Sequence, residues 1–145
     1  MILVVADTSA LLAAADTDHP EQAASLKALE NAGLVVISPL IIAEADHLVR
    51  RIGGPVLRDA LLDGIIEQGR RGRFLVPDIT VDVLATARTV MRRYASLDLD
   101  LADAVNAALA AEYRTDTVLT LDRRDFRAMR PLTAHTCFRL LPDDA

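Results

Sequence analysis

The sequence predicts an α/β protein, a three-layer α/β/α sandwich with a central parallel sheet of four to five strands. Short apolar segments alternate with helical segments along the chain, and the connections are short, a pattern typical of parallel sheets covered by helices. The opening run 2–5 is continuously apolar and rich in β-branched residues, as expected of a strand buried on both faces. With 145 residues, we expect a single domain spanning 1–145.

Apolar periodicity and turn residues predict the position of each element. Pro20 begins a helix that Gly33 ends. Ser38 and Pro39 begin another helix, which the Gly-Gly-Pro segment 53–55 interrupts. The predicted strands, in chain order, are 2–5, 34–37, 74–76, 117–121 and 137–141. The predicted helices are 10–15, 20–31, 39–51, 56–68, 81–94, one that ends near residue 113, and 123–129.

Composition narrows the class of protein and of partner. Hydrophobic residues make up 52% and charged residues 26% of the chain, which indicates a globular protein and not a disordered one. Aromatic residues are only 3% and the formal net charge is -5. These values argue against a base-stacking platform and against a general polyanion-binding surface. The single cysteine, Cys137, excludes an internal disulfide and a cysteine metal cluster.

The sequence carries no pattern of a targeting or membrane segment. Its N-terminus lacks a basic region, and Asp7 interrupts the short apolar run there. No apolar stretch approaches the roughly 18 residues that a membrane span needs. We therefore expect a soluble, cytoplasmic protein with no membrane partner.

Asp7 directly follows the first predicted strand, which we expect to be central in the sheet. Open α/β sheets bind ligands at the carboxyl ends of their strands, so Asp7 lies at the expected active edge. The alternative is a structural role, because aspartate is also a preferred N-cap for the helix that follows. Asp7 by itself does not decide between the two interpretations.

Glu44 lies in an otherwise apolar helix that follows the second predicted strand. It either faces a functional site or joins a solvated stripe with Asp46, His47 and Arg50. The Glu44-x-x-His47 spacing also matches half of a di-iron carboxylate site. That chemistry needs a second such motif, which the sequence lacks, so this interpretation is excluded.

Asp103 is the hardest acid to explain by structure alone. Its helix is apolar nearly all round, so it packs on several sides, and an isolated carboxylate there is costly unless paired or bound to metal. Asp100 stands three residues earlier, the spacing of an N-cap with Asp103 in the first turn. We expect Asp100 to be the cap and Asp103 to be the site residue.

Asp122 follows the fourth predicted strand and so reaches the same edge of the sheet. It is also placed to cap the next helix, with Asp125 in that helix's first turn. Both interpretations remain open for Asp122.

Four segments of the chain thus deliver an acid to one edge of the sheet. Crowded carboxylates repel one another and raise the pKa of at least one member, and a divalent cation relieves that repulsion. Oxygen ligands favour Mg²⁺ or Mn²⁺, often with water and substrate phosphate, which is the equipment of metal-assisted phosphodiester hydrolysis. No catalytic triad or cysteine motif competes, and the three histidines lack zinc spacing: His19, His47 and His135.

The chain resembles the PIN-domain ribonucleases and, within them, the VapC-type toxins of bacterial toxin–antitoxin pairs. The resemblance covers almost the whole chain, and its motifs occur in family order: 5–12 (VADTSALL), 37–44 (ISPLIIAE), 101–104 (LADA) and 119–126 (LTLDRRDF). It implies a Mg²⁺- or Mn²⁺-dependent endoribonuclease that a cognate antitoxin inhibits, commonly as a toxin homodimer.

The resemblance also implies roles for single residues. Asp7 and Asp103 match the principal metal ligands, and Glu44 and Asp122 match two further catalytic acids that bind a second ion or orient water. Thr8 or Ser9 matches a polar position that hydrogen-bonds the acids. Two further acids near the motifs have no assigned family role and are kept as supporting candidates: Asp100 and Asp125.

RNA contact must come from local arginines, since the chain as a whole is acidic. Lys27 is the only lysine, and arginine binds phosphate in a bidentate manner. Among several arginine pairs, Arg123 and Arg124 are the first candidates because they directly follow Asp122.

The sequence leaves three other functions open. A PIN-like nuclease of RNA processing would share every site residue, and only genomic context would separate it from a toxin. A phosphoacceptor domain or haloacid-dehalogenase-like phosphatase also clusters aspartates. The first needs a lysine late in the chain, and the second needs Asp-x-Asp where this chain has Asp7-Thr8-Ser9. The last alternative is a catalytically silent binding domain.

Overall fold

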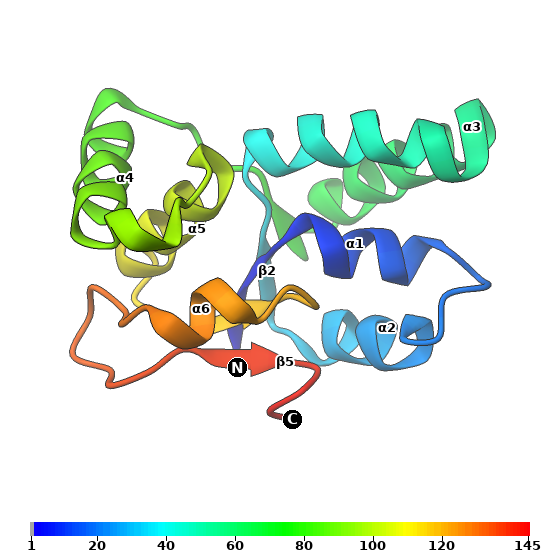
Figure 1. Ribbon diagram of the computed structural model, residues 1–145. Coiled ribbons are helices and arrows are strands. Elements are labelled where there is room, and N and C mark those ends of the chain that lie inside the picture. The colour runs from blue at the N-terminus through cyan, green and yellow to red at the C-terminus, as the bar shows by residue number, and fades with distance from the viewer. Residues whose placement is uncertain (1) are drawn as a thin grey trace.

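The computed structural model describes residues 2–145 and contains a five-stranded parallel sheet between two helical layers (Figure 1). All four strand pairings are parallel, and the strand order is β3-β2-β1-β4-β5. The strands are β1 (Leu3–Ala6), β2 (Leu34–Val36), β3 (Phe74–Leu75), β4 (Thr117–Leu119) and β5 (Arg139–Leu141). The predicted fold class is confirmed.

Strand β1 is the central strand, as its unbroken apolar run predicts. It pairs with β2 through Val4 and Val35, and with β4 through Val5 and Val118. Side chains alternate across a strand, and both faces of β1 are covered: Val4 belongs to one apolar core and Val5 to the other. The residue that follows β1 is therefore held at the centre of the sheet.

The helices form one layer on each face of the sheet (Figure 1). One core lies between the sheet and α1–α3 and includes Leu11 and Ile41, and the other lies against α4–α6 and includes Leu109 and Phe126. Phe126 packs edge to face on Phe138 with ring centroids 5.5 Å apart, a favourable aromatic geometry. The helices are α1 (Thr8–Ala15), α2 (Gln22–Asn31), α3 (Pro39–Arg70), α4 (Val81–Arg93), α5 (Leu101–Glu112) and α6 (Arg124–Ala128), and the 3-10 turn η1 (Ala95–Leu97) joins α4 to α5.

The predicted break at the Gly-Gly-Pro segment is present as a sharp kink inside α3. Gly54 has φ 64° and ψ -159°, a conformation almost restricted to glycine. Pro55 follows it and cannot donate a helical hydrogen bond. Figure 1 shows the result, since α3 runs outward and then doubles back as a second arm.

Element boundaries differ from the predictions by a few residues, with local causes. Helix α1 begins at Thr8 and not at residue 10, because the carboxylate of Asp7 accepts the backbone N–H of Thr8 at 2.8 Å. Strand β4 ends at Leu119 and not at residue 121, because the side chain of Thr120 turns into a hydrogen-bond network. Strand β5 begins at Arg139, two residues later than predicted.

Across residues 2–145, no helix combines the length and the apolar character that crossing a lipid bilayer requires.

Two glycines of α3 should respond oppositely to alanine. Gly54→Ala forces a side chain into a positive-φ conformation and should destabilise the fold by about 1–2 kcal/mol. Gly64 lies within the second arm, and an added Cβ there meets nothing within 4 Å, so Gly64→Ala should stabilise by about 0.5–1 kcal/mol. Urea denaturation of both variants measures the change in the free energy of unfolding. Changes of the same sign in the two variants would contradict the assigned kink.

Candidate active site

The carboxyl edge of the sheet brings together acids from four separate segments. Asp7 follows β1, Glu44 lies in the first arm of α3, Asp103 lies in the first turn of α5, and Asp122 follows β4. Their proximity is evident in their electrostatics, because the charges of Asp7 and Asp122 raise the pKa of Asp103. The charges of Asp100 and Asp7 likewise raise the pKa of Glu44, so all four predicted acids lie near the same edge of the sheet.

Asp7 is the most firmly held acid of the cluster. Its backbone N–H donates to Leu119 O at 2.8 Å, which joins it to the end of β4. Its Oδ1 accepts the Thr8 N–H at 2.8 Å, and its Oδ2 accepts the Thr120 hydroxyl at 2.7 Å. Burial raises the pKa of Asp7, while these two hydrogen bonds hold it down. Asp7 is therefore both the predicted helix cap and a member of the acid cluster.

Thr120 is a site residue to which the sequence analysis assigned no role. Its side chain is fully buried, and its single proton goes to Asp7. It accepts from the Asp122 N–H at 3.0 Å and lies 3.2 Å from Ser9 Oγ. Ser9 Oγ accepts the Leu121 N–H at 2.9 Å, and it donates its own proton to Thr120 because the Thr120 proton goes to Asp7. The sequence offered one signal: a polar residue between two leucines, two positions before Asp122.

The two residues predicted to support the acids act differently from one another. Ser9 reaches Asp7 through Thr120. The Thr8 hydroxyl is buried and makes no hydrogen bond, although it lies near enough to Glu44 to oppose the rise in the pKa of that carboxyl. Of the pair, Ser9 belongs to the hydrogen-bond network around Asp7.

The prediction that Asp100 caps α5 is confirmed, and Asp103 lies near the other acids. Asp100 is exposed and caps α5, with its Oδ1 accepting the Asp103 N–H at 2.9 Å. Asp103 is partly buried, and burial raises its pKa to about 8, with further contributions from the charges of Asp7, Asp100 and Asp122. Without a cation, the neutral form of Asp103 is therefore favoured at neutral pH.

Glu44 belongs to the acid cluster and not to the polar stripe of α3. Burial is the largest cause of its raised pKa, and the charges of Asp100 and Asp7 add to it. On the same helix, Asp46 lies 3.9 Å from Arg58, and His47 lies beside Arg51. These neighbours form the solvated stripe, which leaves Glu44 with the acids.

Asp122 does not cap the next helix, so the structural interpretation that the sequence left open for it does not hold. The N-cap of α6 is Arg123, and no side chain caps this helix. The backbone N–H of Asp122 is instead bound by Thr120, which turns the chain before α6 begins. Asp122 is exposed and adds its charge to that of Asp7 and Asp103.

The two arginines that the sequence analysis named as RNA contacts differ in how closely neighbouring acids pair with them. Arg123 lies 3.6 Å from Glu21 and 3.8 Å from Asp143, so other acids already pair with it. Arg124 has an 83% exposed side chain and lies 3.6 Å from Asp125. One carboxylate oxygen of Asp125 is buried without a hydrogen bond. Arg124 is thus the freer of the two predicted RNA contacts.

The acid cluster has no compensating cation within residues 2–145. Its members make no ion pair to lysine, arginine or histidine in that range: Asp7, Glu44, Asp100, Asp103 and Asp122. In the same range, no three Asp, Glu, His or Cys side chains already converge as a ligand set. Mg²⁺ characteristically takes only one or two carboxylates and completes its shell with water. Hard oxygen donors with unneutralised charge therefore fit such an ion.

The comparisons with known proteins agree with this architecture. Residues 4–130 match the family model of the PIN domain. The chain belongs to the PIN-domain family. Within that family it is 37% identical over 131 residues to Ribonuclease VapC26 of Mycobacterium tuberculosis (strain ATCC 25618 / H37Rv), which covers 89% of this chain and 93% of that protein.

Two solved structures share the PIN-domain fold of this chain. Mycobacterium tuberculosis VapC20, described as a sarcin-ricin loop cleaving toxin, matches with a TM-score of 0.68 and 17% identity, over 79% of this chain and 86% of that one. VapBC2 from Rickettsia felis, bound to a DNA fragment from their promoter, matches with a TM-score of 0.67 and 17% identity, over 96% and 98%. At this identity the two structures establish the fold alone.

The raised pKa of Asp103 predicts how stability depends on pH. Its folded-state pKa of about 8 exceeds the ordinary value of 3.8, so the folded state binds this proton more tightly. Stability without divalent cations is then lost as pH rises from about 4 to about 8. Asp103→Asn removes that loss. We therefore expect this variant to melt several degrees above wild type at pH 8, which corresponds to about 1–2 kcal/mol of stability. At pH 4 we expect no such difference.

Thermal melts in EDTA across this pH range provide the measurement. Asp63→Asn, which changes an exposed acid of α3, is the matched control and should follow wild type. Parallel pH profiles for wild type and Asp103→Asn would show that Asp103 does not carry the proton.

Proposed function

We propose that this protein is a cytoplasmic, Mg²⁺- or Mn²⁺-dependent endoribonuclease and the toxin of a toxin–antitoxin pair. The observation that carries the proposal is the uncompensated acid cluster at the carboxyl edge of the central strand. Similarity to Ribonuclease VapC26 along nearly the whole chain supports RNA as the substrate and a toxin role. The acids supply what phosphodiester hydrolysis with a metal ion needs.

In this mechanism Asp7 and Asp103 would hold the metal ion. When bound, the ion would supply Lewis-acid stabilisation of the phosphate and lower the pKa of water. Thr8 N–H and Thr120 Oγ1 each donate to one oxygen of Asp7, which fixes its orientation. Asp103 must give up its proton before it binds a cation. Glu44 and Asp122 bind a second ion or orient the attacking water.

RNA contact falls to side chains at the rim of the cluster. Arg124 is exposed and only two residues from Asp122, so it is placed to bind a phosphate next to the cleaved bond. Asp125 lies beside it and lowers the local positive potential. Because the chain carries a net charge of -5, phosphate binding depends on local arginines such as Arg124.

Removing either proposed metal ligand should abolish cleavage while the fold persists. Asp7→Asn and Asp103→Asn each delete a carboxylate, and we expect RNA cleavage to fall by roughly a hundredfold or more, with loss of growth arrest on expression. Cleavage of a labelled RNA in Mn²⁺, together with circular dichroism, measures both properties. Asp63→Asn is the control with intact cleavage.

The proposal would be wrong if either variant cleaved RNA at the wild-type rate. Wild-type cleavage without growth arrest would instead indicate a nuclease of RNA processing.

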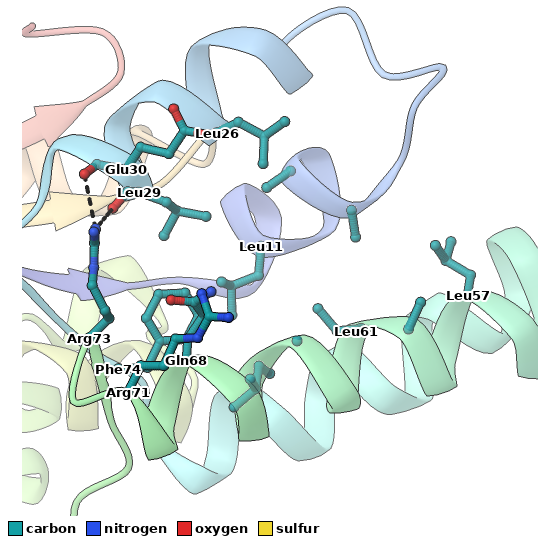
Figure 2. A pocket seen from close by; sticks show the side chains of 15 residues that line it. Leu11, Leu26, Leu29, Glu30, Leu57, Leu61, Gln68, Arg71, Arg73 and Phe74 are labelled. Carbon is teal, nitrogen blue, oxygen red and sulfur yellow. Dashed lines mark hydrogen bonds between the residues drawn. The ribbon is translucent and has the colours of Figure 1, made fainter.

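The partner of a toxin needs a docking surface, and an apolar groove separate from the acids provides one. The groove has a volume of about 550 Å³ and lies between α1, α2 and the second arm of α3 (Figure 2). Arg73 fixes one wall, since its guanidinium donates to Leu29 O, Glu30 O and Ala32 O at the end of α2. Its apolar lining includes Leu11, Leu26, Leu29, Leu57, Leu61 and Phe74.

We propose that this groove receives an apolar helix of the antitoxin. A leucine-lined channel between helices suits the apolar face of an amphipathic helix. The homodimer that the family resemblance implies stays a prediction.

A charge in the groove should weaken antitoxin binding and spare catalysis. Leu26 lines the groove and is 38% exposed, so Leu26→Asp should be tolerated by the fold. We expect at least roughly tenfold weaker binding of the small protein encoded beside the toxin gene, since an apolar anchor is lost. Val56→Asp changes an 82% exposed residue outside the groove and is the control.

Affinity of the co-expressed pair and cleavage by the free toxin are the two measurements. Equal affinity for Leu26→Asp and Val56→Asp would place the antitoxin elsewhere.

A further inference from the structure

Asn106 is a buried polar residue that the proposed mechanism leaves without a role. It lies in α5 with no exposed surface, three residues after Asp103 and hence on the same helix face. Its Nδ2 donates to the backbone carbonyl of Ala6 at 3.4 Å. Ala6 immediately precedes Asp7, so this hydrogen bond joins the two segments that carry the proposed metal ligands.

The orientation of the Asn106 amide follows from this contact. Ala6 O can only accept a hydrogen bond, so the nitrogen must face it and the oxygen must face away. That oxygen, Oδ1, is buried and has no hydrogen-bond partner. An unpaired buried acceptor is costly, and native structures rarely keep one without a reason.

The unpaired Asn106 Oδ1 lies one helical turn from Asp103, the proposed metal ligand on the same helix face. A divalent ion held by two carboxylates keeps several water ligands, and such a water is the hydrogen-bond donor that this atom lacks.

We propose that Asn106 is a positioning residue of the metal site, which rests on the proposed function. Its Nδ2 sets the separation of α5 from the end of β1, and its Oδ1 would accept a hydrogen bond from a water molecule held by the ion. Partners of this kind typically change metal affinity by about 10–100-fold.

A purely structural role needs only the hydrogen bond from Nδ2 to Ala6 O and leaves the buried, unpaired Oδ1 without a function. The neighbours of Asn106 on α5 are apolar, including Val105 and Leu109, so no protein group beside it on the helix satisfies this acceptor. The two interpretations predict different Mn²⁺ affinities when the amide is replaced.

The test is a Mn²⁺ titration of the full chain, with free Mn²⁺ followed by electron paramagnetic resonance. Asn106→Leu removes both amide groups in a similar branched shape, and Asn106→Ala is the smaller variant in case leucine does not fit. We expect Mn²⁺ binding to weaken at least roughly tenfold in both. Melting in EDTA should change little for Asn106→Leu, because an unpaired acceptor is lost together with a long hydrogen bond.

Ser25→Ala is the matched control. Ser25 lies in α2, away from the acids, and its hydroxyl is likewise fully buried and unpaired. Its removal should leave Mn²⁺ affinity unchanged.

Two outcomes would overturn the proposal in distinguishable ways. If wild type binds Mn²⁺ and both Asn106 variants bind it equally well, Asn106 is structural, and the proposed nuclease function is unaffected. If wild type itself fails to bind Mn²⁺, the metal-dependent function fails and this inference fails with it.

Discussion

The structure is arranged around a cluster of negative charge that no lysine, arginine or histidine of residues 2–145 pairs with. Asp7 cannot move away from the other acids, because the sheet holds its backbone through Leu119 and Thr120 holds its carboxylate. The field of this fixed charge, added to burial, is what raises the pKa of Asp103. The site without metal is thus held together by the surrounding fold against its own repulsion, as expected where a divalent ion supplies the missing charge.

The scaffold resists that repulsion with rigid elements on both sides of the sheet. Asp100 caps α5 and so fixes its first turn, while the helix behind it is buried through Val105 and Leu109. Near the chain end, Arg127 binds Asp143 and Asp144 at 2.7–2.8 Å, and Asp144 also accepts the Leu140 N–H. These contacts tie α6 to β5. The segment carrying Asp122 is therefore anchored at both ends.

Helix α1 links the two surfaces that the proposed function requires. Its first turn is capped by Asp7 at the acid cluster, and Leu11, one turn further along, lines the apolar groove. Both surfaces thus depend on the packing of a single short helix against β1. A partner seated in the groove would contact the element whose N-terminus holds the central acid.

The sequence by itself determined the fold class, the central place of β1 and the segments that carry the acids, because apolar periodicity and strand ends are local properties of the chain. It also predicted that Asp100 caps α5 while Asp103 faces the site. Only the tertiary structure decided that Thr120 orients Asp7, that Asp122 caps no helix, and that Asn106 reaches Ala6. These contacts join residues about 100 positions apart, and no local pattern encodes which polar side chain meets which partner across the sheet.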